Sequence, residues 1–267
     1  MAATQGNHIG TSGSCRPGGA ADAVRPPRWR PGWRGGLAWG APFGVLLGVL
    51  LVRNAFLFSA PEYERADMGA NSILIEQARR LSLLVGNYSR EGFSHPGPAF
   101  LYVESWGESL FWAGLRLVPT AWNGQLIGLY GLNALFAASV VAVGYGWTRS
   151  ARGALAAGAA VACLGAVHPA VFSSDWMPYV YVPAFLAFVV SAASVSAGRS
   201  ADAWIAALSG WFLIHGHAAF LFIVPALAAF LAVLRALTAR RGRLARAARG
   251  RAWLPVAGIS AVFALPL

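Results

Sequence analysis

Residues 124–147 have the sequence GQLIGLYGLNALFAASVVAVGYGW, which contains no Asp, Glu, Lys or Arg. About 20 helical residues, each rising about 1.5 Å, cover the roughly 30 Å hydrocarbon core of a bilayer. A run this long and this apolar predicts a helix that crosses a membrane. The stretch therefore predicts an all-α fold built on membrane-spanning helices.

Similar apolar runs lie on both sides of this stretch. Residues 203–237 would form a single helix of about 50 Å, which is too long for one crossing. We therefore expect two short crossings that turn near His215-Gly216-His217. The last run is still apolar at Leu267, which predicts a C-terminally truncated fragment. The other predicted crossings, with these two short ones, are residues 37–59, 154–172, 177–197, 203–216, 218–237 and, in part, 253–267.

The composition agrees with a membrane protein and excludes other classes. Hydrophobic residues make up 57% of the chain and charged residues 12%, whereas a soluble domain usually has about 25% charged residues. The two cysteines, Cys15 and Cys163, are too few and too differently placed for a disulfide framework. All 21 basic residues are arginine, which is typical of a GC-rich bacterial genome.

Basic and acidic residues are sorted into different segments. Residues 1–36 contain five arginines, residues 235–251 contain seven, and residues 62–108 contain seven of the ten acids. Because arginine-rich loops stay on the cytoplasmic side, we expect a multi-pass protein of the bacterial cell membrane with a disordered, basic, cytoplasmic tail at 1–36. Residues 60–123 then form an extracytoplasmic loop. This sorting explains the net charge of +11 without nucleic-acid binding.

The outer loop is predicted to carry two amphipathic helices that lie along the membrane interface. The first is indicated by apolar residues at helical spacing, opposite Glu76, Arg79 and Arg80: these apolar residues are Leu74, Ala78, Leu81 and Val85. The second covers residues 100–117, whose tryptophans suit the headgroup level. Between the helices, GNYSREGFSHPGP at residues 86–98 is predicted to be irregular because glycines and prolines interrupt it.

Three acids, Glu62, Glu64 and Asp67, follow the first predicted crossing. A carboxylate there can act as a general base or bind a metal, while solvated loop charges are the simpler interpretation. Arg53 lies within an apolar run, where an arginine is costly unless it snorkels or pairs. It either snorkels to the outer headgroups or clamps a phosphate.

Polar side chains also occur in the irregular loop and at the predicted outer turn. Tyr88, Arg90 and His95 can line a headgroup or sugar site, although turn chemistry explains the neighbouring glycine and prolines by itself. His215 and His217 can contact a polar substrate or a metal. No third ligand has a recognisable spacing, so we predict no metal site and no cofactor.

Several well-known motifs do not occur in the sequence. There is no Walker loop, no H-E-x-x-H and no G-x-S-x-G, nor a strand followed by G-x-G-x-x-G. The sequence therefore argues against ATP-driven transport and zincin chemistry in these residues.

The order of a first crossing, an acid just outside it, an amphipathic helix and the block YSREGFSHPGP resembles bacterial members of the GT-C superfamily. These are polytopic glycosyltransferases that use polyprenyl-phosphate sugars. The closest likeness is to an actinobacterial-type group with a Y-S-R-x-G-F-x-H-P-G-P block, here Tyr88–Pro98. Residues 176–180 and His215-Gly216-His217 look like further landmarks of that group.

The resemblance implies transfer of a sugar, with inversion, at the outer membrane face. An acid of the first outer loop would be the base, and the spacing to the Tyr88 block assigns this role to Asp67, with Glu64 as the second candidate. The chain has Glu-x-Glu-x-x-Asp where the family commonly has adjacent acids. Expected partners are a polyprenyl-phosphate-linked sugar, membrane lipids and an acceptor glycan, lipid or protein. Candidate substrate-binding residues are Arg53, Tyr88, Arg90, His95, His215 and His217.

Two other functions compete with a glycosyltransferase. A transporter commonly has internal repeats, and the sequence contains no convincing repeat. A non-catalytic membrane protein that binds lipid-linked sugars would use the same Arg53 and His95 and would differ only in lacking turnover.

Overall fold

The structure is a computed structural model that describes residues 33–240 and 253–265, with side chains for 36–237 and 253–265. Within these ranges the secondary structure is helical, which confirms the predicted all-α class, and one isolated β-bridge joins Tyr88 and Ser94. The α-helices are α1 (Trp33–Arg53), α2 (Asp67–Arg79), α3 (Ala99–Gly107), α4 (Ala121–Thr148), α5 (Ala151–Val167), α6 (Ala170–Ser173), α7 (Met177–Ser196), α8 (Ala203–Gly216), α9 (Phe220–Arg240) and α10 (Leu254–Ala264). Shorter segments are η1 (Ala55–Phe58), the π-helix η2 (Glu108–Gly114) and η3 (Ser200–Asp202).

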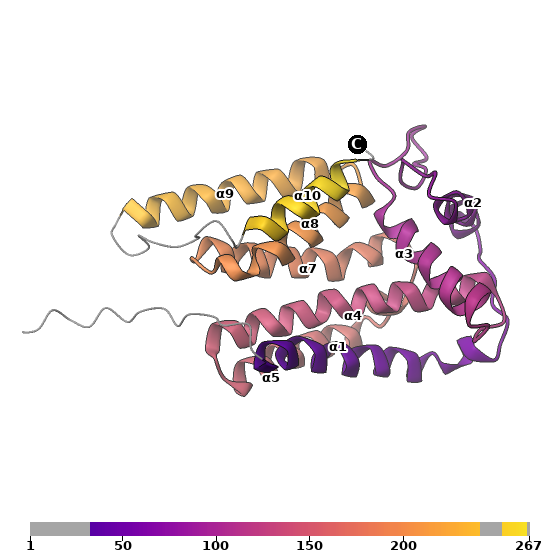
Figure 1. The fold of residues 1–267 in the computed structure, drawn as a ribbon, viewed down its shortest axis with the longest axis horizontal. Coiled ribbons are helices and arrows are strands. Elements are labelled where there is room, and N and C mark those ends of the chain that lie inside the picture. Colours follow the sequence, from indigo (N-terminus) through magenta and orange to yellow (C-terminus); the bar gives the residue numbers. More distant parts are fainter. Residues whose placement is uncertain (1–32, 241–252, 266–267) are drawn as a thin grey trace, which may run out of the picture. The chain divides into compact units, whose positions relative to one another are not determined.

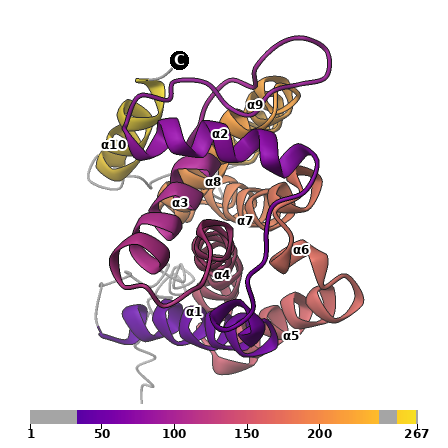
Figure 2. The ribbon, with the colours of Figure 1, turned by 90° about the vertical axis from the view of Figure 1, so that its right-hand side faces the viewer.

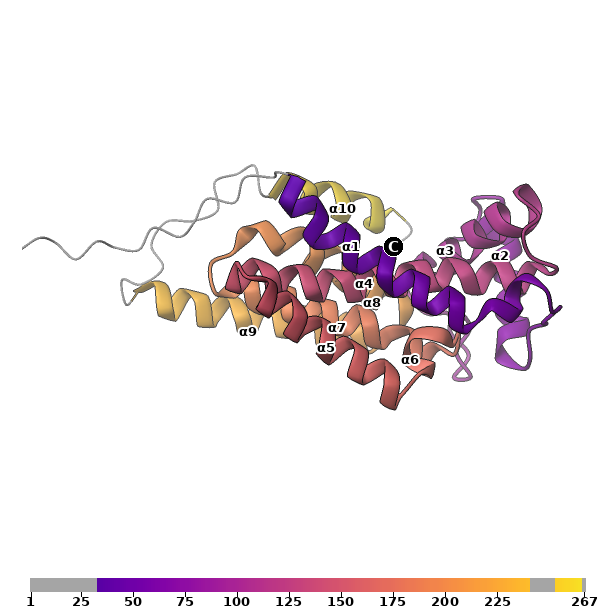
Figure 3. The same cartoon turned by 90° about the horizontal axis from the view of Figure 1, so that it is seen from below.

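Helix α4 is the centre of the bundle. It packs against α1, α3, α5 and α7, and Figure 2 views it end-on among its neighbours. Its side chains Leu129 and Phe136 are buried with Val180 of α7 and Leu213 of α8. Helices α2 and α3 lie at the end of the bundle where α1 ends and α4 begins (Figures 1 and 3).

Among the residues that the structure describes, four helices are long and apolar enough to cross a membrane: Gly36–Arg53, Ala121–Thr148, Met177–Ser196 and Phe220–Leu237. They indicate a membrane protein by their length and composition. The apolar residues 203–237 do divide as expected, because α8 ends at Gly216 and α9 begins at Phe220. The predicted tail before residue 33 and residues 241–251 of the predicted basic loop lie outside the described residues.

The first apolar run ends its regular helix earlier than predicted. Helix α1 stops at Arg53 and is followed by the short η1, so Arg53 is the last residue of the helix instead of an interior one. The Asn54 side chain donates to the Leu50 carbonyl at 2.8 Å. The Asn54 backbone N–H donates to the same carbonyl at 3.1 Å, and asparagine favours helix ends because its short side chain bonds readily to nearby backbone groups.

The predicted face of the first interface helix is wrong at its C-terminal end. Helix α2 begins at Asp67 and ends at Arg79, and Leu81 adopts a left-handed backbone with φ of 55°. Both Leu81 and Val85 are exposed beyond the helix. The residues that α2 buries are Asn71, Ile75 and Ala78, and Ile75 and Ala78 cluster with Leu101 of α3.

The second predicted helix forms as α3 and η2, and its buried face carries its acids. Glu104 and Glu108 are 4% and 5% exposed, while Trp106 is 61% exposed. The cause is a close approach of two helices at Gly107. A Cβ on Gly107 would lie 2.8 Å from the Gly128 Cα of α4, so only glycine fits. The face of α3 that carries Gly107 is therefore packed against α4.

Candidate functional site at the end of the bundle

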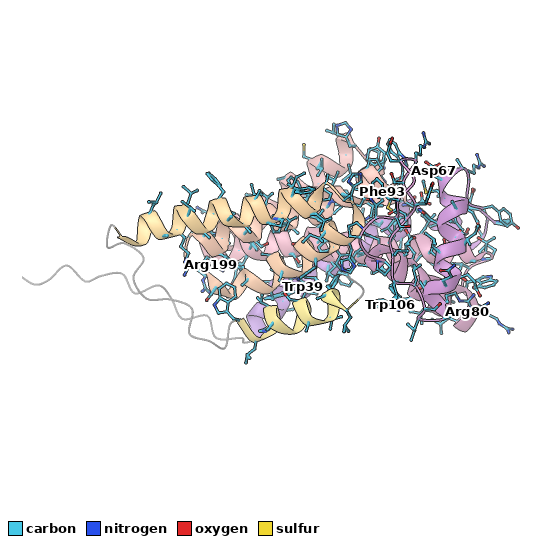
Figure 4. The ribbon with its side chains drawn as sticks, turned by 90° about the horizontal axis from the view of Figure 1, so that it is seen from above. Trp39, Asp67, Arg80, Phe93, Trp106 and Arg199 are labelled. Atoms are coloured by element: carbon cyan, nitrogen blue, oxygen red, sulfur yellow. The ribbon has the colours of Figure 1, made fainter. Side chains whose placement is uncertain are left out.

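The sequence-predicted site residues occur at helix ends and on the segments that join helices at the α2–α3 end of the bundle. Figure 4 labels Asp67 and Phe93 at this end and Arg199 towards the opposite one. The structure brings the predicted residues together in two groups, Asp67 with Arg90 and His95 with His217. It leaves Arg53, Glu64 and Tyr88 outside both groups.

Asp67 and Arg90 form an exposed ion pair. The Arg90 Nη2 donates to Asp67 Oδ2 at 3.2 Å, and the side chains of Arg90 and Asp67 are 87% and 62% exposed, respectively. Asp67 is the first residue of α2, where the helix dipole favours a negative charge. Because both side chains are exposed, a ligand can reach them. An exposed ion pair also adds little to the stability of the fold.

A buried asparagine fixes the chain that leads to Asp67. The Asn123 Nδ2 donates to the carbonyls of Leu57 and Ala60, each at 2.8 Å, and its Oδ1 accepts from the Glu62 backbone N–H at 3.2 Å. Thr120, the N-cap of α4, donates its hydroxyl to the Glu62 carbonyl at 2.7 Å. Glu62 is therefore held through its backbone. Its carboxylate makes no hydrogen bond among the described residues.

The block at residues 86–98 folds back on itself. Ser89 N–H donates to the Phe93 carbonyl at 2.8 Å, and His95 N–H donates to the Asn87 carbonyl at 2.9 Å. Gly92 has φ of 82°, a left-handed conformation that favours glycine at this turn. The irregular loop predicted from the prolines and glycines is thus a tight hairpin-like turn.

This block packs directly on the turn between α8 and α9. Gly97 N–H donates to the His215 carbonyl at 3.1 Å, and Ala218 N–H donates to His95 Nδ1 at 3.3 Å. The rings of His95 and His217 have centroids 4.5 Å apart with an interplanar angle of 31°. Two segments more than 100 residues apart, which the sequence analysis selected separately, are in contact.

The three histidines have different surroundings. His95 is 6% exposed and His217 is exposed. His215 is 2% exposed, and its Nε2 lies 2.8 Å from the Phe263 carbonyl. Its imidazole lies directly against Gly97, where a Cβ would overlap the Nδ1 atom. The position of His215 favours a packing role over the predicted direct contact with substrate.

Three other predicted residues are not drawn into these groups. Arg53 is exposed at the end of α1 and makes no hydrogen bond or ion pair within the described part of the chain. Tyr88 is 63% exposed. Glu64 lies beside the first turn of α2, where a Cβ added to Gly69 would be 3.8 Å from the Glu64 Cγ.

Two acids, the buried Glu104 and the half-buried Asp175, were missed as site candidates by the sequence analysis. Glu104 has no hydrogen-bond partner among the described residues, and burial raises its pKa well above its usual range, with the charge of Asp175 adding to the effect. Burial also raises the pKa of Asp175, which accepts from Trp122 Nε1 at 2.9 Å. The available signal was an acid inside the apolar helix AFLYVESWG, where a carboxylate is costly.

Glu108 is buried but fully paired. Its Oε1 accepts from Arg79 Nη1 at 2.9 Å and its Oε2 accepts from Gln125 Nε2 at 2.8 Å. Arg79 also pairs with Glu76 at 3.1 Å on the exposed side. The Arg79–Glu108–Gln125 contacts attach α2 to η2 and α4, and so they support the helix that begins with Asp67.

Within residues 33–240 and 253–265, no group of three His, Cys, Asp or Glu side chains could hold a metal ion. Comparison of the chain with protein-family models, with curated proteins and with solved structures finds no match.

Proposed function

We propose that this protein is an integral membrane glycosyltransferase that moves a sugar from a polyprenyl-phosphate donor to a cell-envelope acceptor. Transfer takes place at the outer membrane face with inversion at the anomeric carbon. The observation that carries the proposal is the contact between the Tyr88–Pro98 block and the His215–His217 turn beside an accessible carboxylate. These are the landmarks on which the resemblance to GT-C enzymes rests.

Asp67 is the general base in this proposal. The acceptor hydroxyl oxygen attacks the anomeric carbon as the bond from that carbon to the phosphate oxygen breaks. The lipid phosphate leaves with the bonding electrons, and the Asp67 carboxylate takes the hydroxyl proton. Arg90, 3.2 Å from Asp67, can reach a nearby phosphate oxygen with its remaining N–H groups. Arg53 is a second phosphate-binding candidate.

The proposed orientation places the N-terminus in the cytoplasm, in the cell membrane of a bacterium, with six crossings and part of a seventh. In a variant without Cys15 and Cys163, a cysteine at position 91 should react with an impermeant thiol reagent in intact cells. A cysteine at position 245 should not react until the cells are opened. Labelling of position 245 from outside would contradict this orientation.

The activity is tested on the full chain reconstituted in lipid, with polyprenyl-phosphate sugars and a crude cell-envelope acceptor. Asp67→Asn should reduce turnover by about 10² to 10⁴, the usual contribution of general-base assistance, and should leave donor binding nearly intact. Glu62→Gln is the matched control, because it also removes an outer-loop carboxylate, and should cost little.

Other outcomes assign a different role. Loss of turnover in Glu64→Gln, with Asp67→Asn unaffected, would move the base to Glu64. Donor binding without any turnover in the parent protein would favour the competing function, a non-catalytic membrane protein that binds lipid-linked sugars.

A further inference from the structure

His95 and His217 meet at the N-terminal end of α9. Their ring centroids are 4.5 Å apart, and α9 begins at Phe220 and runs for 21 residues. The dipole of a helix favours an anion at its N-terminus, although the N–H groups of Ala218 and Ala219 themselves donate to the two histidine rings. His95 is more than nine-tenths buried, yet its Nε2 has no hydrogen-bond partner among the described residues.

The hydrogen bonds of the backbone fix the tautomer of both rings. Ala218 N–H donates to His95 Nδ1 at 3.3 Å, and Ala219 N–H donates to His217 Nδ1 at 3.1 Å. A ring nitrogen that accepts a hydrogen bond carries no proton, so each neutral imidazole carries its proton on Nε2. Both histidines therefore offer an Nε2–H donor, and neither donor is used by the described residues.

This arrangement suits an anion better than a metal ion. A metal bound at Nε2 would need the lone pair of that nitrogen and would move the proton to Nδ1, where it would face a backbone N–H. Burial lowers the pKa of His95, and the neighbouring His217 adds to this effect. The His95 ring is thus kept in the neutral form that the hydrogen bond from Ala218 requires.

We infer that the Nε2–H groups of His95 and His217 donate hydrogen bonds to oxygens of one phosphate group. The inference deepens the proposed function and rests on it for the source of that phosphate. A lipid-linked phosphate and free phosphate share this chemistry. The role given to His217 and His95 is that of binding residues, separate from the proton transfer assigned to Asp67.

Two kinds of substitution distinguish the role of Nδ1 from the role of Nε2. Asparagine places an amide oxygen near the position of Nδ1, so His95→Asn and His217→Asn keep an acceptor for the backbone N–H and lose the Nε2 donor. Glutamine places an amide NH₂ near the position of Nε2, so His95→Gln and His217→Gln keep the donor. Equal thermal midpoints for the four variants and the parent would show that the fold is retained.

The binding experiment uses the full chain in detergent micelles, titrated with polyprenyl monophosphate, with the matching polyprenol and with inorganic phosphate. Each Asn variant should weaken polyprenyl-phosphate binding about tenfold or more, as expected for one hydrogen bond to a charged group. Each Gln variant should stay within about threefold of the parent. Polyprenol should bind equally weakly to all proteins. Saturable binding of inorganic phosphate with the same Asn and Gln pattern would support the phosphate site and identify free phosphate as a source.

Three results would overturn the inference. Parent protein that binds neither phosphate probe in a saturable way has no such site. Equal loss in the Asn and Gln variants would assign the rings a role in packing. Binding that needs zinc and is removed by a chelator would make the histidines metal ligands. These outcomes are independent of turnover in Asp67→Asn, so failure of the inference can be distinguished from failure of the proposed function.

Discussion

The acids between α1 and α4 fall into two groups with opposite surroundings. Asp67 lies in an exposed ion pair with Arg90, whereas Glu104 and Glu108 are only 4% and 5% exposed. An exposed carboxylate is accessible to a ligand and contributes little to the fold. A buried carboxylate either ties helices together, as Glu108 does, or carries a desolvation cost, as Glu104 does. The presence of a charged residue in this segment is therefore no guide by itself to function.

The largest effect is expected where buried polar support holds the exposed group in place. Asn123 is fully buried and joins α4 to Leu57, Ala60 and Glu62. Asn123→Ala should lower the free energy of unfolding by about 3 kcal/mol, because several partly buried backbone groups lose their partner. Thermal unfolding in detergent, followed by tryptophan fluorescence, measures it.

The control for Asn123→Ala is Asn54→Ala, which removes one partly buried bond to Leu50. It should cost much less than Asn123→Ala. If Asn123→Ala lowers the free energy of unfolding as little as Asn54→Ala does, the segment before Asp67 does not depend on Asn123.

The next effect compares two acids on the same arginine. Glu108→Gln removes the buried charge next to Arg79 and should lower the free energy of unfolding by about 1 to 2 kcal/mol. Glu76→Gln removes the exposed partner of the same guanidinium and should give no measurable change. Thermal midpoints of the two variants and the parent make the comparison. A larger loss in Glu76→Gln would reverse the distinction between buried and exposed acids.

A smaller effect is the pH dependence caused by Glu104. Burial raises the pKa of this acid in the folded state, so above its ordinary value of 4.5 the unfolded chain releases a proton that the folded chain keeps. The free energy of unfolding therefore falls as the pH rises through this window. Glu104→Gln cannot ionise and should gain stability over the parent as the pH is raised above 4.5. Midpoints measured from about pH 4 upwards test this, and a constant difference would refute the buried, protonated state.

The smallest effect is expected at the exposed pair itself. Arg90→Gln should leave the thermal midpoint unchanged, because both side chains of the pair are more than half exposed. The same variant should weaken binding of polyprenyl phosphate if Arg90 contacts the donor. A clear drop in the midpoint would show that this pair supports the fold after all.

Much of the bundle follows from the sequence because apolar length and helix breakers are local signals. The prediction of a helix at residues 177–197 agrees with α7 at Met177–Ser196, and the expected turn at Gly216 is present. Local spacing failed at α2, because Leu74, Ala78, Leu81 and Val85 have a helical period although the helix stops at Arg79. The left-handed backbone at Leu81, which ends the helix, cannot be recognised from the spacing of the apolar residues.

The site was only partly predictable. The sequence selected His95 and His217 separately, but only the fold shows that their rings meet. The buried face of α3 depends on a tertiary contact, since Gly107 approaches Gly128 closely and Glu104 and Glu108 share the same side. Small residues spaced four apart, such as Gly124 and Gly128, indicate such close helix packing. From this spacing one could have predicted that the face of Glu104 and Glu108 is buried.

The contacts of Asn123 also have a consequence for how the protein is made. Asn123 follows Glu62 by 61 residues. At about 5 to 20 residues per second, the ribosome needs roughly 3 to 12 seconds to synthesise that length. During this interval α1 exists without the side chain that later anchors Leu57, Ala60 and Glu62. A nascent chain arrested before residue 123 should therefore be cut between residues 54 and 66 by a protease that has access to this segment, and one arrested well beyond α4 should resist.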